Sequence, residues 1–125
     1  GPITGKDRSE LLGNASVMLC PTQYIEPFGK AAVEAMLCGT PVLAPTYGAY
    51  TETVQHGENG YHCRVLQDWI EGIEKAPDLS RFQISSNARQ RYSFATVGKL
   101  YHEAFQQIAD IHREGGGWYS YRRKL

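Results

Sequence analysis

Short continuous runs of apolar residues alternate along the chain with longer segments in which apolar residues recur every three or four positions. The runs 16–21 and 41–44 are typical of parallel strands buried on both faces, and residues 61–65 indicate a third strand. The three-to-four spacing predicts helices between them. The expected helices cover residues 8–13, 27–38, 68–76, 80–92 and 95–113, with a short helical segment ending at Val54. This alternation predicts an α/β fold with a partial, doubly wound, Rossmann-like parallel sheet of about three strands.

The last predicted helix carries one apolar stripe, and the sequence after it changes character. The stripe comprises Val97, Leu100, Tyr101, Ala104, Phe105 and Ile108. Residues 115–125 combine glycines with aromatic and basic side chains, so we expect residues 1–114 to form one domain and 115–125 a terminal tail. We expect the tail to belong to a terminal segment that packs back on a preceding domain. A membrane surface and a partner protein are the alternatives, because aromatic rings beside basic residues favour an interface.

A loop and the helix after it, residues 22–38, form the most informative part of the chain. Pro27 suits the first position of a helix, because its missing N–H needs no partner there. Gly29 in the first turn leaves the free N–H groups of the helix open to a ligand. Gly39 is placed to end the helix in a left-handed conformation, and Pro41 prevents its continuation. The pattern predicts a helix N-terminus with free donors and partial positive charge, which is suited to binding an anion.

Two acidic residues frame this N-terminus. Glu26 lies just before the helix, and Glu34 follows eight residues later. Such a pair alone is most often a solvated helix face. Eight helical steps, however, separate two positions by about 80° and roughly 12 Å. We therefore expect both carboxylates to face one groove and to contact different parts of an elongated ligand.

This segment resembles the donor-binding signature of retaining GT-B glycosyltransferases, in particular that of glycosyltransferase family four. The matching motifs are Glu26-x7-Glu34, the turn Pro27-Phe28-Gly29 and the run Glu34-Ala35-Met36-x-x-Gly39-Thr40-Pro41-Val42. Segments 9–22, 48–54 and 57–61 also resemble the family, so the resemblance covers roughly residues 5–110. It implies the carboxy-terminal half of the second, nucleotide-sugar-binding domain of a GT-B enzyme.

The resemblance also assigns roles to residues. In the family, the first glutamate contacts hydroxyls of the donor sugar, and the second binds the ribose hydroxyls of the nucleotide. Backbone N–H groups at the Phe-Gly turn hold the sugar and the diphosphate. By position, these roles fall to Glu26, to Glu34, and to the turn formed by Pro27, Phe28, Gly29 and the amide of Lys30. Glu26 is the candidate catalytic residue because it would contact the transferred sugar, but neither glutamate is expected to act as a general base or nucleophile.

Gly48 is a further donor-binding candidate at a position that matches the family. Its backbone is placed to approach a phosphate, with Tyr47 or Tyr50 covering the nucleotide. The alternative is that Gly48 forms a turn and that the two tyrosines pack at the sheet edge.

Cations for the donor diphosphate are scarce in this chain. The resemblance places the arginine and lysine that would bind it in the absent half of the domain. Lys30 lies beside the helix N-terminus, but we expect it to pair with Glu26 or Glu34 rather than with phosphate.

Composition excludes several other functions. Of the 125 residues, 42% are hydrophobic and 21% charged, which is typical of a globular protein. Thirteen basic and thirteen acidic residues balance, so no net field favours nucleic acid. Cys20, Cys38 and Cys63 form no close pair and are expected to be thiols in a reducing cytosol. No pair of histidines or cysteines has metal-ligand spacing, so neither a metal nor another cofactor is expected. A cytoplasmic protein is favoured, with peripheral membrane contact as an alternative.

The expected function is therefore donor binding in a glycosyltransferase that transfers a hexosyl group from a UDP- or GDP-hexose to a hydroxyl acceptor with retention. A missing N-terminal GT-B domain would supply the acceptor site. The alternative is a non-catalytic nucleotide-binding or oligomerising module, because a partial sheet exposes a strand edge that can pair with a second copy.

Overall fold

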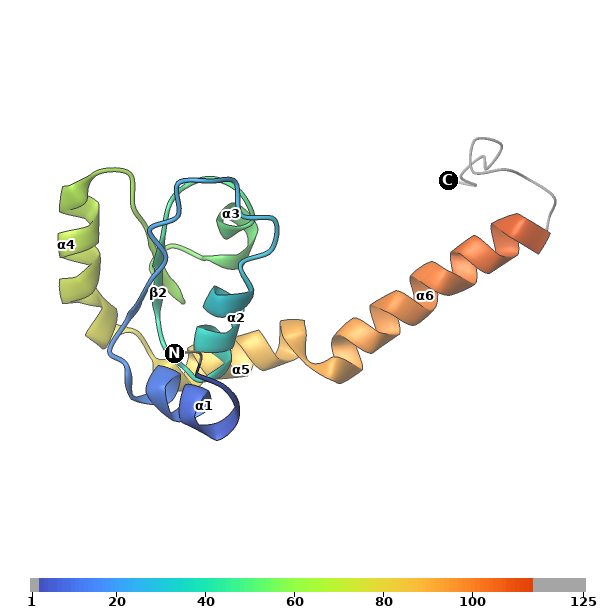
Figure 1. The fold of residues 1–125 in the computed structure, drawn as a ribbon, viewed down its shortest axis with the longest axis horizontal. Helices are drawn as coiled ribbons and strands as arrows, with labels where there is room; N and C mark the ends of the chain where they lie inside the picture. The colour runs from blue at the N-terminus through green and yellow to red at the C-terminus, as the bar shows by residue number, and fades with distance from the viewer. Residues whose placement is uncertain (1–2, 114–125) are drawn as a thin grey trace. The chain divides into compact units, whose positions relative to one another are not determined.

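The computed structural model describes residues 3–113 of the chain, so the predicted tail at 115–125 lies outside the described residues. The chain divides into two compact units, one up to Gln90 and one from Arg91 onward. The first unit contains the sheet and most of the helices (Figure 1). The two units are described separately below.

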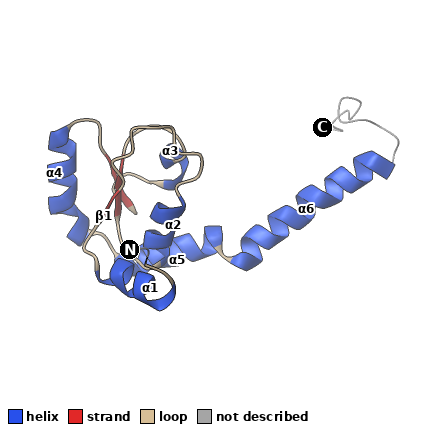
Figure 2. Ribbon diagram, viewed as in Figure 1, coloured by secondary structure: helices blue, strands red, loops and turns tan. Residues whose placement is uncertain are grey.

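The first unit is built on a three-stranded parallel sheet in the order β1-β2-β3. The strands are β1 (Met18–Leu19), β2 (Val42–Ala44) and β3 (Gly60–His62). Helices cover both faces, with α4 (Leu66–Lys75) on one and α2 (Lys30–Leu37) and α3 (Tyr50–Thr53) on the other (Figure 2). This arrangement confirms the predicted partial α/β sheet.

The burial of the strands follows their position in the sheet. All three residues of the central strand β2 are fully buried, as the apolar run 41–44 predicted. Leu19 of β1, in contrast, is 45% exposed. The prediction that this run is buried on both faces is therefore wrong for β1, because β1 pairs with a neighbour on one side only among the described residues.

The core packs around β2. On the α4 side, Leu43 contacts Cys63 and Ala76, and the half-buried ring of Trp69 packs against them. On the other side α2 buries small and apolar residues: Ala32, Val33, Ala35 and Met36. All three cysteines are free thiols, two of them buried, and burial raises the pKa of Cys63 to about 11.

The helices of the first unit begin and end close to their predicted positions. Asp68 lies in the first turn of α4, where its carboxylate accepts the N–H groups of Arg64 and Val65. A short 3-10 turn (Ala76–Asp78) follows α4 and leads to α5 (Arg81–Tyr92). Helix α2 ends at Leu37, and Gly39 behind it has the left-handed φ of 80° that its place in the sequence predicted.

Helix α1 (Gly5–Asn14) is attached to the unit mainly by polar contacts, since none of its residues is buried. Arg81 of α5 donates to the carbonyl oxygens of Gly13 (2.6 Å) and Ala15 (2.7 Å) at the end of α1. The same guanidinium donates to the Thr40 hydroxyl at 3.0 Å, which in turn donates to the Leu12 carbonyl. These bonds fix the C-terminal end of α1 next to the turn that follows α2.

The second unit contains one long helix, α6 (Phe94–Arg113). The predicted apolar stripe is present, and its large side chains Leu100, Tyr101, Phe105 and Ile108 are exposed. Among the described residues, no helix is both long and apolar enough to cross a membrane.

Candidate functional site

The loop after β1 leads directly into α2, which begins three residues later than predicted. Helix α2 starts at Lys30, and Gly29 precedes it as the N-cap residue with a left-handed φ of 77°. Pro27 therefore lies in the loop rather than at the first helical position, and Gly29 does not belong to the first turn. The physical reason is that a left-handed φ cannot be continued as a right-handed helix, so Gly29 sets where α2 can start.

The carboxylate of Glu26 occupies the N-terminal end of α2. Its Oε1 atom accepts the N–H of Gly29 at 2.9 Å and that of Phe28 at 3.5 Å, and its Oε2 atom accepts the hydroxyl of Tyr24 at 2.9 Å. These bonds, the one from Gly29 foremost, hold the pKa of Glu26 below its usual value. The two amides that the sequence predicted to be free for a ligand are thus bound by the chain's own carboxylate. Glu26 takes this position because it is the nearest anion to the positive end of the helix.

The amide of Lys30 is the next donor along the helix. No described residue accepts a hydrogen bond from the backbone N–H groups of Lys30 or Ala31, as is usual for the first turn of a helix. The side chain of Lys30 is exposed and forms no ion pair with Glu26 or Glu34 in the described part of the chain. The expected pairing of Lys30 with these acids is therefore wrong.

Glu34 pairs instead with an arginine from another helix. Arg8 of α1 donates from Nη2 to Oε1 of Glu34 at 2.9 Å. The Glu34 side chain is 21% exposed and that of Arg8 45%. Sequence reasoning missed Arg8, because no local pattern reports a contact between residues 26 positions apart.

Gly48 approaches the backbone of Glu26 closely. Its φ is 64°, and a Cβ atom at this position would lie 2.8 Å from both the N and the O of Glu26. The N–H of Ala49 donates to the same carbonyl oxygen at 2.8 Å. Gly48 thus has a turn conformation packed against Glu26, and its approach to a phosphate stays a prediction. The loop after β2 therefore holds the loop after β1 in place.

The two tyrosines of this second loop also have structural contacts. Tyr50 is only 3% exposed, and its ring lies against Gly29, where a Cβ would come within 3.0 Å of Cε1. Burial raises the pKa of Tyr50 to about 12. The hydroxyl of Tyr47 donates to the carbonyl of Thr22. Of the two alternatives for Tyr50, packing is the one observed.

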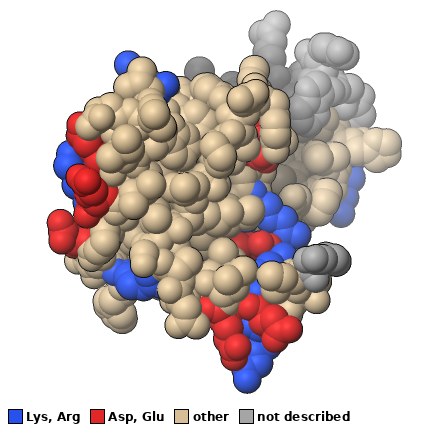
Figure 3. Space-filling model, turned by 60° about the vertical axis from the view of Figure 1, so that its left-hand side comes forward, with Lys and Arg blue, Asp and Glu red and all other residues tan. Residues whose placement is uncertain are grey.

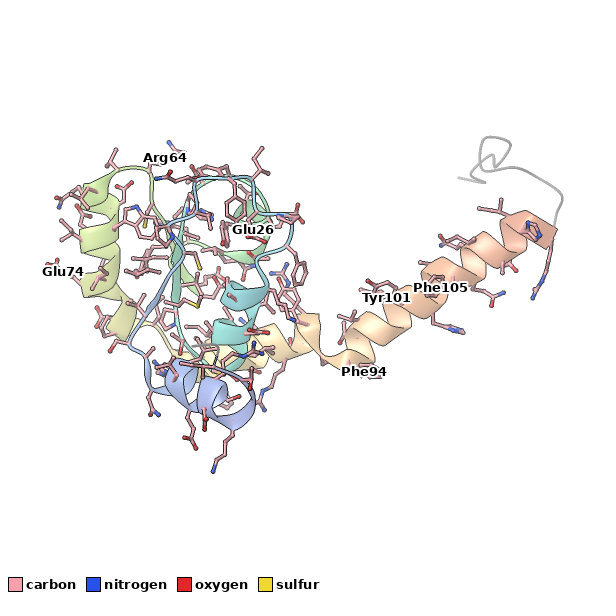
Figure 4. All side chains as sticks on the ribbon, in the orientation of Figure 1. Glu26, Arg64, Glu74, Phe94, Tyr101 and Phe105 are labelled. Carbon is pink, nitrogen blue, oxygen red and sulfur yellow. The ribbon has the colours of Figure 1, made fainter. Side chains whose placement is uncertain are left out.

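A cavity of about 420 Å³ opens beside these loops at the carboxyl ends of the strands. Gln23, Tyr47, Arg64 and Trp69 are among the residues that line it. Arg64 and Glu26 lie at the same end of the unit (Figure 4). Sequence reasoning missed Arg64 as a cation at this edge, because the predicted third strand, 61–65, included it, whereas β3 ends at His62 and Arg64 follows it.

The charged residues of the surface are mixed in sign. On the face shown in Figure 3, Lys and Arg lie next to Asp and Glu around a largely uncharged area. Within residues 3–113, no group of three or more His, Cys, Asp or Glu side chains is placed to hold a metal ion. This edge of the unit carries the carboxylate of Glu26, the amides at the start of α2 that bond to no described residue and the side chain of Arg64, while Glu34 lies further along α2, paired with Arg8. Such groups can bind a polar ligand that carries hydroxyl and anionic groups.

Comparison with known proteins identifies the family of the chain. The family model of the group 1 glycosyl transferases matches residues 1–91. Rice sucrose synthase 4 is 28% identical over 82% of this chain, and the D-inositol 3-phosphate glycosyltransferase of Streptomyces coelicolor is 32% identical over 84%. The chain spans 13% and 25% of the length of these two relatives.

Solved structures show the same fold. Crystal structures of Anabaena HepE with UDP and with UDP-glucose superpose with TM-scores of 0.73 and 0.72. The sequence identity is 27%, over 82% of this chain and 30% of HepE. The three-stranded sheet and its helices are thus a fragment of a Rossmann-like GT-B domain. Because the family model covers most of its length, the chain belongs to the group 1 glycosyl transferases.

Proposed function

We propose that this chain is the donor-binding part of a retaining glycosyltransferase that transfers a hexosyl group from a nucleoside diphosphate sugar to a hydroxyl acceptor. The observation that carries the proposal is the N-terminus of α2 at the carboxyl ends of the strands, where backbone amides already bind one carboxylate. Ligands of open parallel sheets bind at this edge. The HepE structures contain UDP and UDP-glucose, which makes a UDP-hexose the first donor to test.

In this proposal each part of the site has one task. The carboxylate of Glu26 accepts hydrogen bonds from sugar hydroxyls, and that of Glu34 from ribose hydroxyls. The N–H groups from Phe28 to Lys30 face the diphosphate, whose negative charge grows as the glycosidic bond breaks, and donors placed there stabilise the leaving group. Binding the donor therefore requires Glu26 to leave the Phe28 and Gly29 amides or to share them.

The rest of the parent protein would supply the remaining groups. Cations that neutralise the diphosphate and the acceptor site belong, in this proposal, to the N-terminal domain and the missing half of this one. We accordingly expect the 125-residue chain to bind nucleotide but not to catalyse transfer. Transfer of glucose from UDP-glucose, or of mannose from GDP-mannose, by the purified chain would contradict this expectation.

A titration of the ¹⁵N-labelled chain with UDP, followed by two-dimensional NMR, tests the proposal. UDP should shift the amide signals of Lys30 and Ala31, and Glu34→Gln should weaken binding by roughly tenfold, the loss of one hydrogen bond to a charged group. Glu71→Gln is the matched control, because Glu71 forms a comparable ion pair with Lys75 on α4. Equal affinity in Glu34→Gln and in the wild type would reject the nucleotide site.

The alternative function, a module that only oligomerises, predicts a different result. The open side of β1 would then pair with a second copy of the chain. Light scattering that finds a stable dimer, together with no response to UDP or GDP, would favour this alternative.

A further inference from the structure

The ion pair between Arg8 and Glu34 leaves hydrogen-bonding groups of both residues unused. Nη2 of Arg8 donates to Oε1 of Glu34 at 2.9 Å. Among residues 3–113, no other group donates to the carboxylate of Glu34, and no other group accepts from the guanidinium of Arg8. Both side chains are partly exposed, so the pair lies at the surface of the unit, where a ligand can approach it.

The placement of Arg8 is fixed by the attachment of α1. Arg81 and Thr40 bind the C-terminal carbonyls of α1, and no apolar side chain of α1 is buried. The helix thus presents Arg8 to α2 from a position that polar contacts determine. Lys6, two residues before Arg8 and on the opposite side of α1, pairs with Glu10 of the same helix rather than with α2.

A hydroxyl group matches the unused atoms of this pair. Each hydroxyl has one donor and two acceptor lone pairs, whereas a carboxylate only accepts and a guanidinium only donates. A carboxylate alone can therefore satisfy only the donor side of a ribose hydroxyl. Glu34 and Arg8 together offer one acceptor and several donors to neighbouring hydroxyls.

We propose that Arg8 positions Glu34 and completes with it a recognition site for the vicinal hydroxyls of the donor ribose. The inference rests on the proposed function, since it needs Glu34 to face the nucleotide. In this arrangement Arg8 holds Oε1 and fixes the side-chain rotamer, Oε2 accepts from a ribose hydroxyl, and a spare N–H of Arg8 donates to a ribose oxygen. The pair selects ribose over deoxyribose.

The test measures that selectivity in the 125-residue chain by NMR titration with UDP and with 2′-deoxy-UDP. Arg8→Met should weaken UDP binding by roughly 5- to 20-fold and lower the affinity ratio of UDP to 2′-deoxy-UDP, although Glu34 remains. Lys6→Met removes the same charge from the same helix and should change neither quantity more than about twofold. The double variant Arg8→Met/Glu34→Gln should bind UDP only slightly more weakly than Glu34→Gln does, because the two residues act as one unit.

The outcomes separate the inference from the proposed function. If Glu34→Gln weakens UDP binding while Arg8→Met changes neither the affinity for UDP nor the affinity ratio of UDP to 2′-deoxy-UDP, the proposed role of Arg8 is wrong and the nucleotide site stands. If the wild-type chain does not bind UDP, both are wrong. If Arg8→Met loses the amide signals of α1, the variant Arg8→Lys replaces it in the test. Lysine keeps the positive charge but lacks the forked N–H donors of arginine. An affinity ratio of UDP to 2′-deoxy-UDP that is unchanged in Arg8→Lys overturns the inference.

Discussion

The carboxylate of Glu26 binds the N-terminal end of its own helix, at the proposed donor site. Its carboxylate is bound on one oxygen by backbone amides and on the other by the Tyr24 hydroxyl. These bonds fix the loop between β1 and α2. A donor sugar would meet a carboxylate that is ionised and already close to the helix N-terminus.

The Tyr24 contact gives a pH-dependent prediction. The pKa of Glu26 is lowered by the Gly29 amide first and by Tyr24 second, so Tyr24→Phe should raise it without bringing it back to its unperturbed value. Because the pKa of Glu26 is lower in the folded than in the unfolded state, its contacts contribute their full stabilisation above the unfolded pKa of about 4.3. This stabilisation is lost as the pH falls through the pKa of Glu26 in the folded protein. Titration of the Glu26 carboxyl carbon by NMR measures the shift.

Tyr47→Phe is the control for this measurement, because the Tyr47 hydroxyl bonds to Thr22 and not to Glu26. It should leave the titration of Glu26 unchanged. An unchanged pKa of Glu26 in Tyr24→Phe would show that the tyrosine contact has no effect on the carboxylate.

Alanine substitutions at Gly48 and Gly57 separate two contributions to the free energy of unfolding: a clash of the new Cβ with backbone atoms, and a positive φ. Gly48 and Gly57 both have left-handed φ values, 64° and 82°, but only a Cβ at Gly48 would meet backbone atoms, those of Glu26 at 2.8 Å. Gly57→Ala should therefore cost about 1 kcal/mol in the free energy of unfolding, the usual penalty of left-handed backbone. Gly48→Ala should cost at least about 1 kcal/mol more, because the two loops must also move apart. Urea denaturation measures both, and equal costs would mean that the loops separate freely.

At the scale of secondary-structure elements, α1 depends on contacts that come from a distant helix. Arg81 binds two carbonyl oxygens of the α1 end and the Thr40 hydroxyl, while α1 itself buries no residue. Ordinary hydrophobic packing therefore contributes little to its position. The contact that brings Arg8 to Glu34 depends on these polar bonds.

Arg81→Met should release α1 while the sheet stays folded. The loss of hydrogen bonds from a charged group should cost about 1 to 3 kcal/mol, concentrated in α1. Amide hydrogen exchange should show lost protection in residues 9–14 and little change in β2. Arg89→Met is the control, since it removes the same side chain from an exposed position of the same helix. Uniform loss of protection across the first unit would contradict a local role for Arg81.

At the scale of the whole molecule, the apolar side of α6 is a surface that the proposed donor site does not use. Leu100, Tyr101, Phe105 and Ile108 are exposed, and the rings of Tyr101 and Phe105 stack with centroids 6.0 Å apart. Contiguous exposed apolar surface favours association. The chain should therefore associate in a concentration-dependent manner.

Phe105→Glu should weaken this association in sedimentation velocity experiments. Gln106→Glu adds the same charge on the side of α6 opposite the apolar stripe and should sediment like the wild type. Identical behaviour of Phe105→Glu and the wild type would exclude α6 as the associating surface.

Much of this protein follows from local sequence patterns. The fully buried β2, the left-handed stop at Gly39 and the position of a helix N-terminus after Glu26 were all predictable, because apolar runs, glycine and proline act over a few residues. The start of α2 was predicted too early, since only the backbone shows that Gly29 adopts a left-handed φ. The burial of β1 was overestimated, because an apolar run does not report how many neighbours a strand has.

The sequence by itself therefore determined the fold class, the family and the two acids at the candidate site. Only the tertiary structure decided what those acids contact: Glu26 binds the amides of its own helix, and Glu34 pairs with Arg8 rather than with Lys30. The physical reason is the separation along the chain over which each kind of interaction acts. Hydrophobic periodicity and turn chemistry are local, whereas hydrogen bonds between side chains depend on which helices the sheet brings together.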